Sequence, residues 1–365
     1  GDEKYARKAA ELFEIYARQY TELPFHSLND SPWATGPATL SASRPAASSS
    51  YGSNWYFKGH CRLLSAISGS SVWTPEFRDR VYQGFVLPYV TELMKFNAPI
   101  SNMSDITNHN LLLLGITFDD ANLVRHALLN DAGVLRRLED IDEEGFSSEG
   151  RSMNYHLAGL TEAVPSLAYA VRAGLKIEFP IARLAAAAEL PFKRAALTGV
   201  IPSSGDNGRG SRVTTSTIAD ELLELAPDQA WLAQIGRGST LAQKLAGQKP
   251  EASSFKSRLE TTPRLFKHAG LAILRTGNTP DEQIMVTLDY GRSVFHAHKD
   301  RQQITLLALG KIYTQGNGSL YNVGSGVTRS KDDRLNSFIG QGSLSQNVIL
   351  VDQQDQLPAI GTLLA

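Results

Sequence analysis

Two histidines separated by one residue, His296 and His298, have the spacing in this sequence that best suits chemistry. They precede the apolar run 304–309, which is typical of a buried strand. Alternate residues of a strand point to the same side, so we expect the two imidazoles to converge on one site. Paired imidazoles suit proton transfer or metal binding. The alternative is a pair of surface histidines ahead of a core strand.

Two polar clusters earlier in the chain each open an apolar segment. Asn108 and His109 precede residues 111–116, and the cluster 149–156, which contains Tyr155, precedes a long apolar stretch. Asn and Ser are favoured at helix N-termini, so we expect each cluster to begin a helix and to face the cavity that the helix end lines. A plain N-cap at Asn108 and a core aromatic at Tyr155 are the alternatives.

In this order the three clusters resemble the motifs of the heparinase II/III-like polysaccharide lyases, which include heparin-sulfate and oligoalginate lyases. The resemblance extends over residues 138–175, where a helix end, the motif D-E-E-G-F, the Tyr155 cluster and an apolar helix follow in the family's order. Residues 346–352 resemble the family's H-N-T-V-V-V-D strand, with Gln346 in place of the histidine. The resemblance implies an acidic polysaccharide or oligosaccharide substrate and a periplasmic or secreted bacterial enzyme.

The reaction that the resemblance implies is β-elimination at a uronic acid. Removal of the C5 proton places a second negative charge beside the carboxylate. Asn108 and His109 are candidates to stabilise these charges, Asn108 as an amide donor and His109 as an imidazolium or a neutral donor. Tyr155 is the candidate acid for the departing 4-oxygen, because a phenol carries its proton at neutral pH. His296 is the candidate base. In the family one Tyr can also serve as both base and acid, and the sequence leaves this open.

Further candidates would bind the substrate: Trp55, Arg151, His156, Arg209 and His298. Trp55 could stack on a sugar ring, although an aromatic at a helix start is more often a core residue. Arg209 lies in the glycine-rich segment 203–212, which lacks the G-K-[ST] of a phosphate loop. We expect this segment to be a mobile loop that offers Arg209 or Arg212 to a carboxylate.

The resemblance also raises a structural zinc at His298. Relatives hold zinc with the second histidine of the pair, an Asp after the next strand, and the histidine before the last strand. Here the Asp position falls at Gln315 and Gly316, and the third ligand appears as Gln346. Zinc needs about four good ligands. We therefore expect no metal and no other cofactor, and we expect His298 to hydrogen-bond within the protein.

Composition is consistent with such an enzyme. The 365 residues are 42% hydrophobic and 20% charged, with a formal net charge of -1. This charge predicts no nucleic-acid partner, so attraction to an acidic sugar must come from a local cluster of cations. The single cysteine, Cys61, excludes an internal disulfide and reads as a core residue. We find no apolar run of the roughly 18 to 20 residues that span a membrane and no apolar signal segment at the N-terminus.

The apolar period changes once along the chain. Helical spacing recurs over residues 5–20, 55–67, 77–96, 108–116, 121–138, 152–175, 181–197, 217–225 and 230–235. Strand patterns follow at 271–275, 283–290, 304–309, 311–314 and 347–351. Runs of helices followed by strands indicate separate domains. We predict an α+β multidomain protein, with a helical, incomplete (α/α) toroid as catalytic domain at 1–250 and an antiparallel β-sheet or sandwich, possibly truncated, at 251–365 that contributes His296.

Two other functional classes stay open. A helical toroid also carries glycoside hydrolases, for which Asp142, Glu143, Glu144 and Glu149 could supply the two carboxyl groups. A non-catalytic polysaccharide-binding protein is the other alternative, and it would leave the three clusters without a shared purpose.

Overall fold

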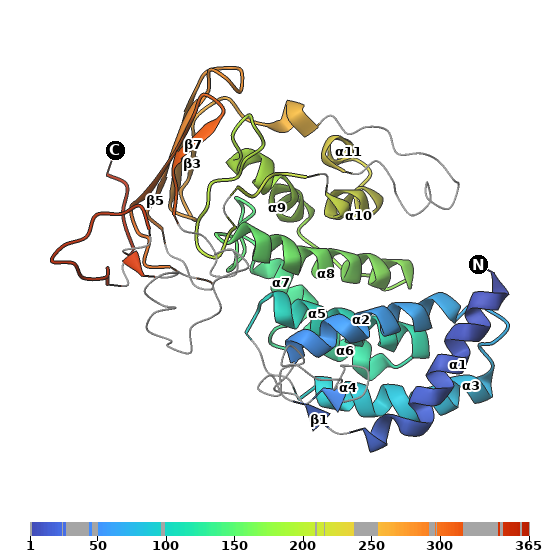
Figure 1. The fold of residues 1–365 in the computed structure, drawn as a ribbon. Helices are drawn as coiled ribbons and strands as arrows, with labels where there is room; N and C mark the ends of the chain where they lie inside the picture. The colour runs from blue at the N-terminus through green and yellow to red at the C-terminus, as the bar shows by residue number, and fades with distance from the viewer. Residues whose placement is uncertain are drawn as a thin grey trace. The chain divides into compact units, whose positions relative to one another are not determined.

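The computed structural model describes residues 2–23, 25–26, 44–45, 50–95, 99–208, 210–214, 216–236, 255–291, 296, 298–316, 342–343, 346–357 and 360–364. The chain forms two compact units (Figure 1). Unit 1 comprises residues 1–138 and 162–179, and unit 2 comprises residues 139–161 and 180–365. Helix α8 (Met153–Arg172) begins in unit 2 and ends in unit 1.

Unit 1 is helical. Its elements are α1 (Glu3–Gln19), η1 (Tyr20–Glu22), the strands β1 (Phe25–His26) and β2 (Arg44–Pro45), α2 (Ser50–Ile67), α3 (Pro75–Val81), the π-helix η4 (Tyr82–Val86), α4 (Leu87–Leu93), α5 (Asn102–Phe118), α6 (Ala121–Leu129) and most of α7 (Val134–Glu139). Aromatic rings centre its core: Phe57 lies 4.9 Å from Tyr89, and Tyr20 lies 5.0 Å from Phe85, between ring centroids. Cys61 is buried in the same core, as predicted.

Helix α5 starts earlier than the sequence indicated. Ser101 caps the helix, and its backbone N–H donates to Ser104 Oγ at 3.0 Å, completing a capping box. Asn108 therefore lies inside the helix, and the prediction that it begins one is wrong. The first turn of the helix contains polar residues that are buried, among them Asn102 and Asp105. Apolar spacing does not register such residues and therefore placed the start of the helix too late.

Unit 2 joins helices to a sheet. Besides the start of α8 it contains α9 (Ile181–Arg194), α10 (Thr217–Leu225), α11 (Leu232–Ile235), η5 (Phe255–Arg258), β3 (Arg264–Phe266), β4 (Leu271–Thr276), β5 (Ile284–Asp289), β6 (Gln303–Ala308) and β7 (Lys311–Thr314). The five strands pair antiparallel in chain order. Four of the five predicted strands are present, whereas residues 347–351 form only an isolated bridge between Val351 and Gln354.

One face of the five-stranded sheet is buried, and it carries most of the polar residues of the strands. The side chains on this face are Leu271, Ile273, Arg275, Met285, Thr287, Asp289, Gln303, Thr305 and Leu307. The opposite face carries mostly aliphatic residues, among them Leu274 and Ile304, which are 62% and 47% exposed. Buried polar groups need partners, and Gln303 finds one in a neighbouring loop, because its Nε2 donates to Ser203 O at 2.8 Å. The sheet thus anchors the loop that begins at Ser203.

The predicted combination of helices with an antiparallel sheet is confirmed. The toroid, the sandwich and the boundary near residue 250 stay predictions, and residues 237–254 lie outside the described chain. Within the described ranges, no helix is both long and apolar enough to cross a membrane.

Candidate active site

Tyr155 and His296 form a stacked pair in unit 2. Their ring centroids lie 3.5 Å apart with an interplanar angle of 15°. Tyr155 lies in the first turn of α8, where its backbone N–H donates to Ser152 O at 2.9 Å. Both side chains are partly exposed. The helix start that the sequence predicted at Tyr155 is thus confirmed, and the structure brings these two predicted site residues together.

Each ring nitrogen of His296 faces a carboxylate. Nδ1 lies 3.0 Å from Asp206 Oδ2, and Nε2 lies 3.4 Å from Glu149 Oε1. Burial opposes a charge on the ring, but hydrogen bonding to Asp206 and Glu149 outweighs burial and raises the pKa of His296 to about 9. His296 is therefore an imidazolium at neutral pH. The predicted role of base needs a ring lone pair, which this environment disfavours.

Asp206 joins the two histidines of the pair. Its Oδ2 contacts His296, and its Oδ1 lies 2.9 Å from His298 Nε2. Burial alone would raise the pKa of Asp206, but the hydrogen bonds from both rings lower it to about 2. The expectation that both histidines share a strand is wrong, because β5 ends at Asp289 and β6 begins at Gln303. They converge on a carboxylate instead, and strand alternation could not have indicated it.

The loop that carries Asp206 is an internal part of unit 2. Residues 203–208 are all buried, and Asp206 N donates to Ser152 Oγ at 3.0 Å. The expectation of a mobile loop is therefore wrong for these residues. Arg209 lies outside the described residues, and Arg212 is exposed with its Nη1 donating to Thr198 O. Asp206 was not among the predicted site residues, because its contact with the two histidines arises only in the folded chain.

His298 hydrogen-bonds within the protein, as predicted. Its Nε2 contacts Asp206, and its Nδ1 lies 3.0 Å from Gln346 Nε2. At the second position of the zinc set, a Cβ on Gly316 would lie 2.2 Å from Gln303 Oε1 and 2.5 Å from Gln346 Oε1. The amides of two glutamines occupy the space that an aspartate ligand would need. These residues therefore do not fit a zinc ion.

Asn108 uses its amide inside unit 1. Its Nδ2 donates to Ala132 O at 2.6 Å, and its Oδ1 accepts from Asn130 Nδ2 at 2.8 Å. The residue is 3% exposed. An amide has two N–H donors, so one remains beyond these contacts. The predicted contact of Asn108 with a substrate carboxylate stays a prediction.

His109 is a neutral imidazole in unit 1. Its Nδ1 lies 3.3 Å from the carbonyl oxygen of Glu162, which can only accept, so Nδ1 carries the proton. Burial, with the positive charges of Arg62 and Lys58, lowers the pKa of His109 to about 3. Its buried Nε2 has no hydrogen-bond partner within the described structure. Of the two forms that the sequence allowed, the imidazolium is disfavoured, and the neutral form presents a lone pair at Nε2.

Of the other predicted substrate-binding residues, Arg151 and His156 form hydrogen bonds within unit 2, and the side chain of Trp55 lies outside the described residues. Arg151 is buried, donates from Nη1 to Ala269 O at 2.9 Å, and forms an ion pair with Asp289. His156 is buried, with its Nδ1 2.9 Å from Ser147 Oγ. Their predicted contact with the substrate stays a prediction. Trp55 belongs to α2, and its side chain lies outside the described residues.

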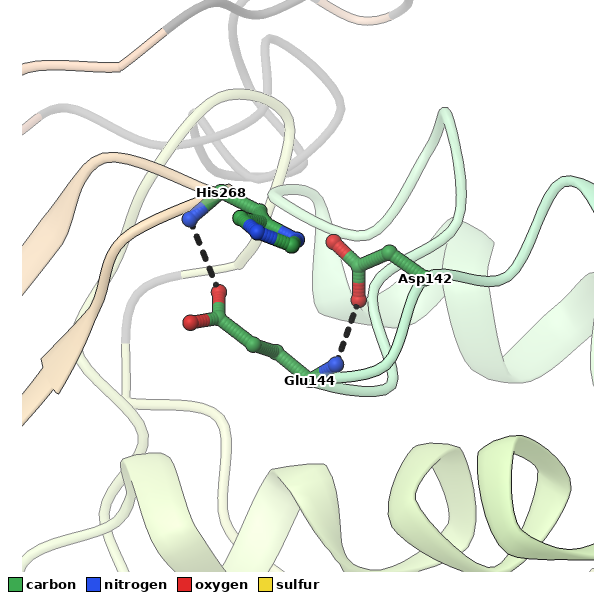
Figure 2. A group of neighbouring side chains, drawn as sticks. All are labelled: Asp142, Glu144 and His268. Atoms are coloured by element: carbon green, nitrogen blue, oxygen red, sulfur yellow. Dashed lines mark hydrogen bonds between the residues drawn. The ribbon is translucent and has the colours of Figure 1, made fainter.

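Two acidic residues of the predicted D-E-E-G-F motif meet a histidine (Figure 2). Ligand atoms of Asp142, Glu144 and His268 lie within 4.8 Å of one another. The carboxylate of Glu144 accepts the backbone N–H groups of Lys267, His268 and Ala269 at 2.8, 3.1 and 3.4 Å, and Asp142 Oδ1 accepts Glu144 N at 2.9 Å. Through these contacts the loop that carries Asp142 and Glu144 is hydrogen-bonded to the β3–β4 turn, and this structural role accounts for the cluster.

The carboxyl groups offered for glycoside hydrolysis have other partners. Asp142 and Glu144 bind backbone N–H groups, and Glu149 faces the imidazolium of His296. Glu143 is exposed, 4.0 Å from Arg183 Nη2. A hydrolase needs a protonated carboxylic acid beside the scissile bond, whereas Glu149 is placed to form an ion pair. The arrangement favours chemistry centred on Tyr155 and His296.

Comparisons with known proteins identify the fold. No protein-family model and no curated protein matches the chain. Among solved structures, the crystal structure of heparinase III has a TM-score of 0.64 and 20% identity, covering 100% of this chain and 54% of that chain. A mutant of heparan sulfate lyase from Pedobacter heparinus has a TM-score of 0.60 and 16% identity, covering 98% and 51%. The chain thus spans about half the length of these proteins. At such identities the likeness shows the fold, and the chain has a heparinase-like polysaccharide lyase fold, as the resemblance predicted.

Proposed function

We propose that this protein cleaves a uronate-containing polysaccharide by β-elimination, with Tyr155 as the reacting side chain. The observation that carries the proposal is the stack of Tyr155 on His296, an imidazole with a carboxylate at each ring nitrogen. The heparinase-like fold supports the reaction class. The predicted helical toroid is retained as part of this proposal. The predicted periplasmic or secreted location is also part of it.

The imidazolium of His296 supplies the charge that the reaction needs. A cation parallel to the phenol ring at 3.5 Å favours a phenolate on Tyr155 by Coulomb attraction, an effect that the neighbouring carboxylates of Asp206 and Glu149 reduce. This phenolate takes the C5 proton of the uronate. The electron pair then forms the C4–C5 double bond as the C4–O4 bond breaks, and the new phenol proton passes to the departing O4. Tyr155 returns to the phenolate and thus serves as both base and acid.

The predicted roles of Asn108 and His109, which belong to unit 1, are kept as proposals with one change. We keep Asn108 as a donor to the substrate carboxylate through its remaining amide N–H. His109 accepts a hydrogen bond at Nε2 instead of donating one, because its proton is at Nδ1. Its low pKa makes it a weak base, so Tyr155 is the better proton acceptor.

Heparan sulfate is the first substrate to test, because solved structures with this fold include heparinase III and a heparan sulfate lyase. Purified protein would be incubated with heparan sulfate, heparin, chondroitin sulfate, alginate and a neutral glucan. We expect ultraviolet absorbance from unsaturated uronates with one or more uronans and none with the glucan, which has no carboxylate next to C5. Saturated products would indicate hydrolysis, and binding without products would indicate a polysaccharide-binding protein.

A further inference from the structure

Asp206 lies at the centre of a hydrogen-bonded series in unit 2. Gln346 Nε2 donates to His298 Nδ1 at 3.0 Å, so the proton of a neutral His298 is on Nε2, which donates to Asp206 Oδ1 at 2.9 Å. His296 Nδ1 donates to the other oxygen, Oδ2, at 3.0 Å. A carboxylate can accept from both rings because both its oxygens are acceptors. No neutral side chain of this size offers two acceptor oxygens.

The backbone around Asp206 is fixed by neighbours on three sides. Gly205 N donates to Asp300 Oδ2 at 3.3 Å, and Asp206 N donates to Ser152 Oγ at 3.0 Å. Gly205 has a φ of +53°, and a Cβ there would lie 2.5 Å from Ser152 Oγ and 2.7 Å from His296 O. The loop is therefore packed directly on the backbone of His296 and on the residue before α8, the helix that carries Tyr155.

We propose that Asp206 is a positioning residue for the reaction: its carboxylate sets the ring orientation and tautomer of both histidines and so holds the His296 ring against Tyr155. The proposal rests on the proposed function for its catalytic consequence. Its structural part stands on the contacts alone. In this chain one buried carboxylate orders the histidine pair, at a place where the residues do not fit zinc.

The structural part of the proposal is tested by determining which ring nitrogen of each histidine carries a proton. Long-range proton–nitrogen NMR spectra of 15N-labelled protein report which nitrogen of each histidine carries a proton, and His298→Gln assigns the His298 signals. We expect His298 to carry a proton at Nε2 in the wild type, because Nε2 faces Asp206. Asp206→Asn has one acceptor oxygen, so at least one of the two rings should change its protonation pattern. A wild-type His298 protonated only at Nδ1 would overturn the proposal without any variant.

The catalytic part is tested by steady-state kinetics on the substrate found active. We expect Asp206→Asn to lower kcat by about 100-fold, the typical cost of a small misplacement of reacting groups, with KM changed much less. Asp206→Glu keeps two acceptor oxygens and should recover part of kcat and the wild-type ring pattern. Asp281→Asn, an exposed carboxylate of the same unit, serves as the control for lost charge.

The two failures are distinguishable. If Asp206→Asn keeps a kcat within a few-fold of wild type together with unchanged ring spectra, the positioning role is refuted and the proposed function stands. If the wild type acts on no uronan, the proposed function fails, while the ring spectra still decide the role of Asp206. Where Asp206→Asn does not fold, the wild-type spectrum and Asp206→Glu give the decision.

Discussion

At the residue scale, the environment of His296 decides which group can take a proton from the substrate. Sequence reasoning assigned the base to His296 because a free imidazole titrates near neutrality. The contacts of the two ring nitrogens with Asp206, 90 positions earlier in the chain, and with Glu149 could not be predicted from the sequence around His296. The pairing of Tyr155 with His296 was predictable from motifs, whereas their charge state depends on contacts that arise only in the folded chain.

Tyr155→Phe should remove nearly all turnover. The change deletes the hydroxyl that moves the proton but keeps an aromatic ring to stack on His296, so substrate binding should persist. General acid and base groups contribute roughly 100- to 10,000-fold, and we expect kcat to fall by that factor with little change in KM. Tyr313→Phe, an exposed tyrosine in β7, is the matched control. A variant within a few-fold of wild type would show that another residue moves the proton.

The charge on His296 should also appear in the pH dependence of stability. The pKa of His296 is raised to about 9 in the folded protein from an ordinary value of 6.5. Between these values the folded state binds more protons than the unfolded state, so the contribution is full below about pH 6.5 and is lost as pH rises through about 9. Urea unfolding at several pH values should show a larger loss for wild type than for His296→Gln. Parallel curves for the two proteins across this window would contradict the assignment.

At the element scale, prediction succeeded where local chemistry and burial agree. Helix α10 has the predicted bounds, because Ser216 caps it and its apolar residues recur at helical spacing. The stretch 77–96 instead became two α-helices joined by the π-helix η4, and 121–138 is broken between α6 and α7. The five residues of η4 are too few to show a period that differs from that of an α-helix. The break between α6 and α7 depends on a turn in which Gly133 N donates to Asn130 O at 2.8 Å.

Two glycines should show how closely η4 packs. In η4, a Cβ on Gly84 would lie 2.0 Å from Ala17 O of α1, whereas Gly59 in α2 has open space around it. Gly84→Ala should cost ~1–3 kcal/mol of unfolding free energy by overpacking. Gly59→Ala should gain ~0.5–1 kcal/mol, because glycine disfavours helix interiors. Denaturant unfolding measures both, and equal effects of the two substitutions would refute the close approach of α1 to η4.

At the scale of the whole molecule, fold and function rest on different observations. The heparinase-like fold is shown by solved structures that share at most 20% identity with the chain, and the chain spans about half their length. Three short motifs predicted that fold, because in their order they resemble those of the heparinase II/III-like polysaccharide lyases. The substrate could not be predicted, since the side chains that distinguish one uronan from another are not encoded in those motifs.

The chemical structure of the new chain end decides whether Tyr155 cleaves the polysaccharide by β-elimination. Heparan sulfate, or whichever uronan is degraded, would be digested with wild-type protein and with Tyr155→Phe, and the products analysed by proton NMR and mass spectrometry. We expect a vinylic C4 proton on the new non-reducing end, no water added, and no such product from Tyr155→Phe. Saturated products that carry an added water, or elimination by Tyr155→Phe at the wild-type rate, would contradict the proposed mechanism.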